Sequence, residues 1–238
     1  TRTLPIGSHI AIPIHLEDGT VYGMFACLSP KPTKSLNSRD LETMRLFANL
    51  ATQQIHANHR SERVLREKRI RIESVLDSGW LSNGGPMVEE FETKLAHRLN
   101  VKHVVAVCNG TVALQVMAKA SGVVGEVIVP SMTFIATPHA MQWVGLTPVF
   151  ADVRFDDHTL DPESIERCIT PRTSAILAVH LWGNPCRVQP LQEIADRHGL
   201  RLLFDASHAF GCEQRGTPVG NFGKAEAISF HATKVMHA

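Results

Sequence analysis

A lysine and an aspartate, each placed at the end of a short apolar segment, are the residues of this sequence best suited to chemistry. Lys234 ends the segment SFHATK, and Asp205 ends the segment LLFD. A lysine amine beside apolar residues can act as a nucleophile toward a carbonyl carbon. A buried carboxylate needs a partner, because burying it unpaired is costly. The residues alone leave two simpler roles open, a surface position for Lys234 and a helix N-cap for Asp205.

Two other turns carry candidate binding residues. In the segment CNGT, Gly110 permits a tight turn, and the N–H groups of Thr111 and Val112 would face an anion at the positive end of a helix. In the segment TFIAT, Phe134 follows a strand that ends at Pro130. Glycine is common in strand–helix turns and phenylalanine is most often a core residue, so both positions also have an ordinary structural interpretation.

The elements that must position these residues alternate between strands and helices from Trp80 onward. Apolar runs and amphipathic periodicity predict strands over 104–108, 127–130, 148–152, 174–179 and 201–205, with helices over 88–99, 111–120, 162–168 and 189–198. This alternation predicts an α/β fold with a mostly parallel sheet covered by helices on both faces. Ligands of such sheets bind at the carboxyl ends of the strands, where the candidate residues fall.

Residues 1–77 follow a different pattern. Period-2 alternation predicts strands over 9–16 and 21–28, joined by a turn, and a helix begins near Ser38. From Arg60 onward this helix is rich in basic residues. A basic helix could bind nucleic acid or a membrane, but acidic residues at i,i+4-type spacing favour a solvated linker or a coiled-coil helix.

Composition excludes several classes of function. The 238 residues carry a formal net charge of +1, which gives no electrostatic bias toward nucleic acid, a membrane or acidic substrates. The five cysteines contain no CxxC pair, as is typical of reduced thiols in a cytoplasmic protein. No HExxH, GxGxxG or P-loop pattern is present, so we expect no metal. The chain begins with Thr1, and we interpret it as a piece of a longer protein.

Six motifs, in a consistent order and at compatible spacing, carry a family resemblance. They are CNGTVALQ, VPSMTFIATPHAMQWVGLTPVFADV, LDPESIE, AVHLWGNPC, FDASHAFG and SFHATK. Together they resemble the DegT-type (DegT/DnrJ/StrS) sugar aminotransferases, a family of fold-type I pyridoxal-phosphate (PLP) enzymes, and the resemblance covers residues 78–238. The segments IAIPIHLEDGTVYGMFACLS and RDLETMRLFANLATQQI resemble the C-terminal half of a GAF domain. We therefore predict a partial GAF-like segment over 1–57, a charged helical linker over 58–77 and the large domain of an aminotransferase over 78–238.

The resemblance implies two catalytic residues. Lys234 matches the family lysine that binds PLP (pyridoxal 5'-phosphate) covalently through its amine and then moves the proton between substrate and cofactor. Asp205 matches the aspartate that faces the pyridine nitrogen and keeps it protonated.

The resemblance also implies the cofactor-binding residues. Phe134 matches an aromatic residue that stacks on the pyridine ring, and His208 matches a position near its opposite face or its phenolic oxygen. Gly110 and Thr111 match the phosphate-binding turn, and Ser229 adds a hydroxyl group to the same phosphate.

The implied reaction transfers an amino group from an amino acid, such as glutamate, to a keto-sugar that is usually linked to a nucleotide. Relatives are generally homodimers. Because they continue well beyond the lysine, we expect this chain to be C-terminally truncated and its activity to be impaired. Two alternatives stay open: a GAF-type signalling or sensor module, and a nonfunctional fusion of two unrelated pieces.

Overall fold

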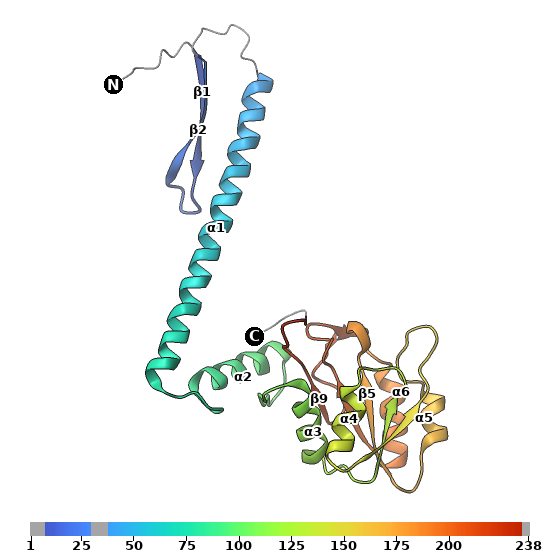
Figure 1. Cartoon of the computed structure of the whole chain (residues 1–238). Helices are drawn as coiled ribbons and strands as arrows, with labels where there is room; N and C mark the ends of the chain where they lie inside the picture. The colour runs from blue at the N-terminus through green and yellow to red at the C-terminus, as the bar shows by residue number, and fades with distance from the viewer. Residues whose placement is uncertain (1–7, 30–37, 235–238) are drawn as a thin grey trace. The chain divides into compact units, whose positions relative to one another are not determined.

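A computed structural model describes residues 8–29 and 38–234 of the chain (Figure 1). The chain divides into two compact units, Thr1–Leu81 and Ser82–Ala238. Each unit is described by itself below. The predicted boundaries within this chain, at residues 57 and 77, stay a prediction, since one helix runs through both positions.

The first unit contains a β-hairpin and a long helix. Strands β1 (Ser8–His15) and β2 (Val21–Ser29) pair antiparallel, and helix α1 (Ser38–Ser78) lies beside the hairpin (Figure 1). The turn between the strands closes where the Leu16 N–H donates to the carbonyl of Thr20 over 2.8 Å. Gly19 in this turn has a φ of 82°, a backbone conformation that favours glycine.

The second unit is built on a sheet of five parallel strands, in the spatial order β4-β3-β5-β6-β9. Their bounds are β3 Glu126–Pro130, β4 Thr147–Ala151, β5 Thr173–Val179, β6 Arg201–Asp205 and β9 Ala225–Ala227. The chain adds β4 on one side of β3 and then β5 on the other. The strand order therefore reverses at β3, the kind of position where ligands bind in open α/β sheets.

Helices cover both faces of this sheet. They are α3 (Gly110–Ala120), α4 (Ala136–Trp143), α5 (Pro162–Cys168) and α6 (Val188–His198). Helix α2 (Pro86–Leu99) contacts loops of the unit instead, as where Phe91 packs against Phe230. The 3-10 turn η1 (Leu181–Gly183) follows β5, and the short strands β7 (Glu213–Gln214) and β8 (Thr217–Pro218) form a hairpin after β6.

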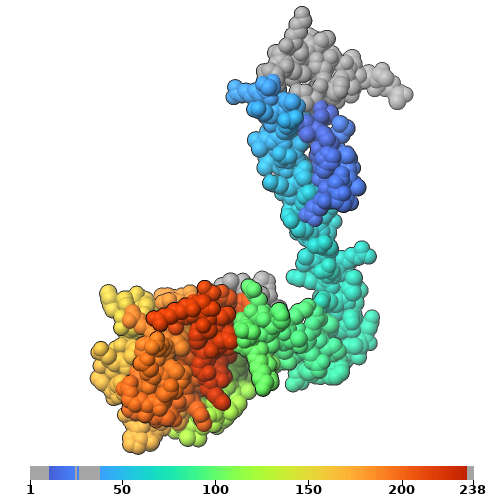
Figure 2. All heavy atoms as spheres, turned by 180° about the vertical axis from the view of Figure 1, so that it is seen from behind, coloured from blue at the N-terminus to red at the C-terminus, as the bar shows by residue number. Residues whose placement is uncertain are grey.

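The core of the second unit contains two large apolar clusters, one on each face of the sheet, and a small third cluster after β6. Along β3 the side chains alternate, so that Val127 and Val129 join one cluster and Ile128 joins the other. The first cluster includes residues of α3 and α4, and the second includes residues of α5 and α6. The atoms of this unit, green to red in Figure 2, form a closely packed body. The predicted α/β class with helices on both faces is confirmed.

The predicted strand over 104–108 is wrong: the segment is not a strand in the structure. Val105 is 74% exposed, and the N–H of Ala106 donates to Oε1 of Glu92 on α2 over 2.7 Å. Apolar alternation indicates extended backbone, but a strand also needs a neighbour to bond with. Here the Glu92 carboxylate accepts the hydrogen bond from a backbone N–H group that would otherwise bond to a neighbouring strand.

Candidate functional site

The parallel strands bring residues that are distant in sequence to one edge of the sheet. All five strands of the large sheet run in the same direction, so their carboxyl ends share one edge. Phe134 follows β3, Asp205 ends β6, and Ser229 and Lys234 follow β9. Gly110 begins α3. The predicted residues therefore lie on loops and ends that the topology directs to this edge.

Asp205 is buried, with 5% of its surface exposed. Its Oδ2 accepts a hydrogen bond from the hydroxyl of Thr137 over 2.8 Å, and its Oδ1 accepts from the Ser207 N–H over 3.1 Å. The Thr137 hydroxyl also lies 2.9 Å from that of Thr133. The carboxylate is therefore held by the side chain of Thr137 on α4 and by the backbone of the loop after β6. The helix N-cap considered for it does not occur, since no helix follows β6 directly.

The start of α3 lies against two serine hydroxyls. A Cβ placed on Gly110 would come within 3.4 Å of the Ser229 Cβ, 3.5 Å of its Oγ and 3.7 Å of the Ser207 Oγ. A larger residue would therefore fill the space between this turn and the serines. The first N–H groups of a helix have no partner within the helix, so an anion in this space would meet both N–H and O–H donors.

One predicted donor is already used in the structure. The N–H of Val112 donates to the side-chain oxygen of Asn109 over 2.9 Å, because Asn109 is the N-cap of α3. The expectation that this N–H faces an anion is therefore wrong. The Asn109 side chain competes for the group, as N-cap residues do, and Thr111 remains the expected donor.

His208 is half-buried and lies near both predicted catalytic residues. Burial lowers the pKa of its imidazole from the ordinary value of 6.5, and the positive charge of Lys234 lowers it further, while the carboxylate of Asp205 acts in the opposite direction. The backbone N–H of Lys234 donates to the carbonyl of His231 over 2.8 Å.

Phe134 precedes α4 and is 66% exposed, so its side chain is not a core residue. Its carbonyl accepts a hydrogen bond from the Thr137 N–H over 3.0 Å. An exposed aromatic ring on a loop that is fixed in this way is available to stack on a planar ligand.

Two residues at this edge were not singled out by sequence. Thr137 contacts Asp205, and Ser207 lies beside Gly110. Both stand inside the quoted motifs, but hydroxyl residues are common in such segments. A signal existed for Thr137, whose spacing of four from Thr133 places the two hydroxyls together at the start of a helix.

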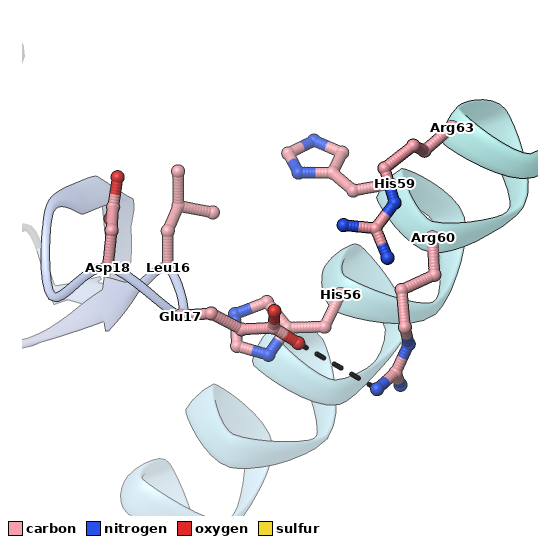
Figure 3. A pocket seen from close by; sticks show the side chains of 7 residues that line it. All are labelled: Leu16, Glu17, Asp18, His56, His59, Arg60 and Arg63. Carbon is pink, nitrogen blue, oxygen red and sulfur yellow. Dashed lines mark ion pairs between the residues drawn. The ribbon is translucent and has the colours of Figure 1, made fainter. Parts of the chain in front are cut away.

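The first unit holds a pocket of about 240 Å³ between its turn and its helix (Figure 3). Glu17 lies 3.7 Å from Arg60 in an ion pair, and hydrogen bonds from Thr20 lower the pKa of Asp18. Acidic and basic side chains thus line opposite walls. The lining residues are Leu16, Glu17, Asp18, His56, His59, Arg60 and Arg63.

Within residues 8–29 and 38–234, no group of three or more His, Cys, Asp or Glu side chains is arranged to hold a metal ion. No helix in the same ranges is long and apolar enough to cross a membrane.

Residues 63–238 match the DegT/DnrJ/EryC1/StrS aminotransferase family, and residues 1–55 match the GAF domain. The family match begins before the predicted boundary at residue 78. The dTDP-4-amino-4,6-dideoxy-D-glucose transaminase of Escherichia coli is 45% identical over 148 residues, which are 62% of this chain and 40% of that protein.

The second unit also resembles solved structures of relatives. A crystal structure of DesI in the presence of its TDP-sugar product has 57% sequence identity and a TM-score of 0.68, over 70% of this chain and 42% of that chain. NtdA of Bacillus subtilis with bound cofactor PMP (the amine form of PLP) has 32% identity and a TM-score of 0.66, over 70% and 38% of the two chains. This chain therefore spans less than half the length of these relatives. Since the family match covers most of its residues, the chain belongs to the DegT/DnrJ/EryC1/StrS aminotransferase family.

Proposed function

We propose that residues 82–238 form the PLP site of an aminotransferase. The observation that carries the proposal is the position of Asp205, a buried carboxylate fixed by Thr137 at the same sheet edge as Lys234. A pyridine aldehyde cofactor requires a lysine amine to bind its aldehyde carbon and a carboxylate to face its ring nitrogen. Lys234 and Asp205 supply these two groups.

The residues present fit the phosphate of this cofactor. The space between Gly110, Ser229 and Ser207 would be filled by a Cβ at residue 110. N–H donors at the start of α3 and the two hydroxyls suit a phosphate dianion without a cluster of basic side chains. Thr111 would contribute to the same group.

When bound, PLP supplies an electron sink for the carbon that loses or gains a proton. Asp205 would hold a proton on the pyridine nitrogen through its negative charge. Lys234 is the amine that would hold the cofactor aldehyde, and its amine would serve as general base and acid toward the substrate proton. Phe134 would cover one face of the ring, and His208 would lie near the other face or the phenolic oxygen.

A cofactor titration tests this proposal. We expect PLP to give a visible absorption band with the whole chain, and borohydride reduction followed by peptide mapping to find the added mass on Lys234. Lys234→Ala should lose both signals. Lys224→Ala, which changes an exposed lysine before β9, is the matched control and should keep them. A band that survives in Lys234→Ala would refute the proposal.

For the whole protein we propose transfer of an amino group from an amino acid to a nucleotide-linked keto-sugar. Support comes from the relatives, a dTDP-sugar transaminase and DesI with its TDP-sugar product. We further propose a homodimer and a cytoplasmic location, the latter supported by free thiols at Cys108, Cys168, Cys186 and Cys212. This chain, at less than half the relatives' length, should catalyse at most weakly.

The half-reaction with an amino donor tests the reaction class separately from substrate choice. Glutamate added to the PLP-loaded chain should bleach the visible band, and TDP-linked or GDP-linked keto-sugars should restore it in any longer form that is active. Light scattering on the same samples measures the oligomeric state. Fast turnover by this chain would contradict the expected impairment.

A second candidate function belongs to residues 1–81, which match part of the GAF domain. The pocket beside α1 favours a sensor role, because its two walls carry opposite charges. The cofactor titration separates the two functions: a chain that binds no PLP but retains a folded first unit would favour the sensor.

A further inference from the structure

A fully buried histidine, His180, directly follows β5. His180 has no exposed surface, and its imidazole stacks on the ring of Phe204 with centroids 4.7 Å apart and planes at 8°. The edge of Phe222 lies against it at 6.1 Å. Aromatic packing alone would suit a phenylalanine here, so the imidazole nitrogens need a separate explanation.

The polar contacts of His180 define its tautomer. Its Nδ1 accepts a hydrogen bond from the Cys186 N–H over 3.0 Å, so in the neutral ring the proton is on Nε2. Nε2 lies 3.4 Å from Oε2 of Glu226, which is also buried. The other oxygen of Glu226 accepts from the N–H groups of Gly220 (2.8 Å) and Phe222 (2.6 Å). Among the described residues neither His180 Nε2 nor Glu226 Oε2 has a hydrogen-bond partner, so the two buried polar atoms face each other without a hydrogen bond, and the negative charge of Glu226 favours a proton on Nε2.

The Cys186 thiol does not act as a nucleophile in this cluster. Burial raises the pKa of the thiol, and its Sγ donates to the carbonyl of Val179 over 3.2 Å. The group therefore stays protonated and anchors the loop after β5 to the end of that strand. His180 and Cys186 together fix both ends of the segment 181–185.

This segment lies directly against His208. A Cβ on Gly183 would come within 3.3 Å of the His208 carbonyl oxygen, and the N–H of Trp182 lies 3.4 Å from the His208 Nδ1 in a hydrogen bond. Trp182 has a φ of 53°, which a non-glycine residue adopts only where its surroundings hold it. The strained residue therefore presents its N–H to the imidazole.

An N–H donor at Nδ1 determines what His208 can do. Nδ1 must accept, so the neutral ring carries its proton on Nε2. We propose that His180 is a positioning residue: paired with Glu226, it fixes segment 181–185 so that Trp182 holds His208 in the Nε2–H tautomer. Under the proposed function, on which this use rests, Nε2–H is the hydrogen-bond donor that His208 offers to the phenolic oxygen of the cofactor.

Imidazole ¹⁵N NMR on the whole chain without cofactor tests the inference. In the unchanged protein, His208 should show an unprotonated Nδ1 and a protonated Nε2. Glu226→Gln keeps the shape of the side chain but removes the negative charge that favours a proton on Nε2 of His180. Nδ1 of His180 then takes up part of the proton, and its hydrogen bond from the Cys186 N–H weakens. The His208 shifts should then move to a tautomer average, and its pKa should rise because a donor to the neutral form is lost.

His180→Phe is the second variant, since it preserves the ring stack on Phe204 while removing both polar contacts. It should change the His208 signals in the same direction. Glu166→Gln, which removes a carboxylate paired with Arg197 and His198 at the surface, is the matched control and should leave them unchanged.

Three results would overturn the proposal: a protonated Nδ1 in the unchanged protein, His208 signals and pKa unaffected in both folded variants, or unfolding of both variants, which would assign the pair to stability alone. Because the measurement needs no cofactor, it can fail while PLP still binds to Lys234, and it can succeed in a protein that binds no PLP.

Discussion

The two units of this chain differ in how much apolar surface they bury. In the second unit, the large side chains of β3, β5 and β6 form two closed clusters. In the described part of the first unit, only Ile14 and Ala48 are buried apolar residues. Large apolar residues such as Met24, Leu65 and Ile72 are each more than 60% exposed there.

This difference shows what a complete sheet contributes. Parallel strands with helices on both faces bury side chains in both directions, whereas a two-stranded hairpin with one helix has a single contact face and is marginal by itself. The site depends on the first kind of packing, because Asp205 is held in place by residues of several elements. The comparison predicts that most of the stability of the chain resides in the second unit.

Native-state hydrogen exchange gives the largest expected contrast. We expect amides of β3, β5 and β6 to open only with global unfolding, and those of β1 and β2 to open locally. We expect exchange in the central strands to be slower by about a thousandfold or more after correction for intrinsic rates, as unfolding free energies of ordinary domains imply. Mass spectrometry of peptides from both units measures this, and equal protection would contradict the comparison.

The same substitution in each unit should give very different losses of stability. Leu177→Ala removes a side chain with no exposed surface from β5 and should lower the free energy of unfolding by about 2–5 kcal/mol. Leu65→Ala changes a residue of α1 that is 65% exposed, and should change it by less than about 0.5 kcal/mol. Urea unfolding measures both, and similar losses would show that α1 packs against something unseen.

A smaller contrast concerns hydroxyl groups. Thr137→Val removes the donor to Oδ2 of the buried Asp205 and should cost about 1–3 kcal/mol. Thr43→Val is the matched change in α1, where the exposed hydroxyl donates to the carbonyl of Arg39, and should cost less than about 0.5 kcal/mol. Thermal unfolding at a fixed pH compares them. Equal costs would mean that Asp205 is solvated or held by another donor.

The sequence predicted most of the second unit because its strands and helices are short, strongly patterned and locally determined. The strands ending at Pro130, Val179 and Asp205 occur as expected. The segment 104–108 does not form the expected strand, because strand pairing depends on a neighbouring strand, and the local sequence does not show whether one is present.

The site shows the same division between local and tertiary information. Residue types at strand ends marked Asp205 and Lys234, but the contact of Thr137 with Asp205 joins positions 68 residues apart. The Asn109 cap that occupies the Val112 N–H was locally readable, because asparagine is a strong N-cap residue. The contact of Trp182 with His208 depends on a strained backbone, which no sequence pattern indicates.

The smallest expected effect concerns the charge of Lys234. Its ammonium group is the second cause, after burial, of the lowered pKa of His208, so Lys234→Met should raise that pKa part of the way toward 6.5. An NMR titration of the His208 imidazole measures the change. Lys119→Met, which removes an exposed charge in the last turn of α3, should have no effect.

The sign of the linked stability effect follows from the same shift. Because the pKa of His208 is lower in the folded chain, the stability that it contributes is complete above pH 6.5 and is lost as the pH falls through the lowered folded value. Lys234→Met should therefore reduce this acid sensitivity, while β1, β2 and α1 should be indifferent to the substitution. An unchanged His208 pKa in Lys234→Met would mean that the amine points away from His208, and the shared edge of the sheet would then no longer support a joint site.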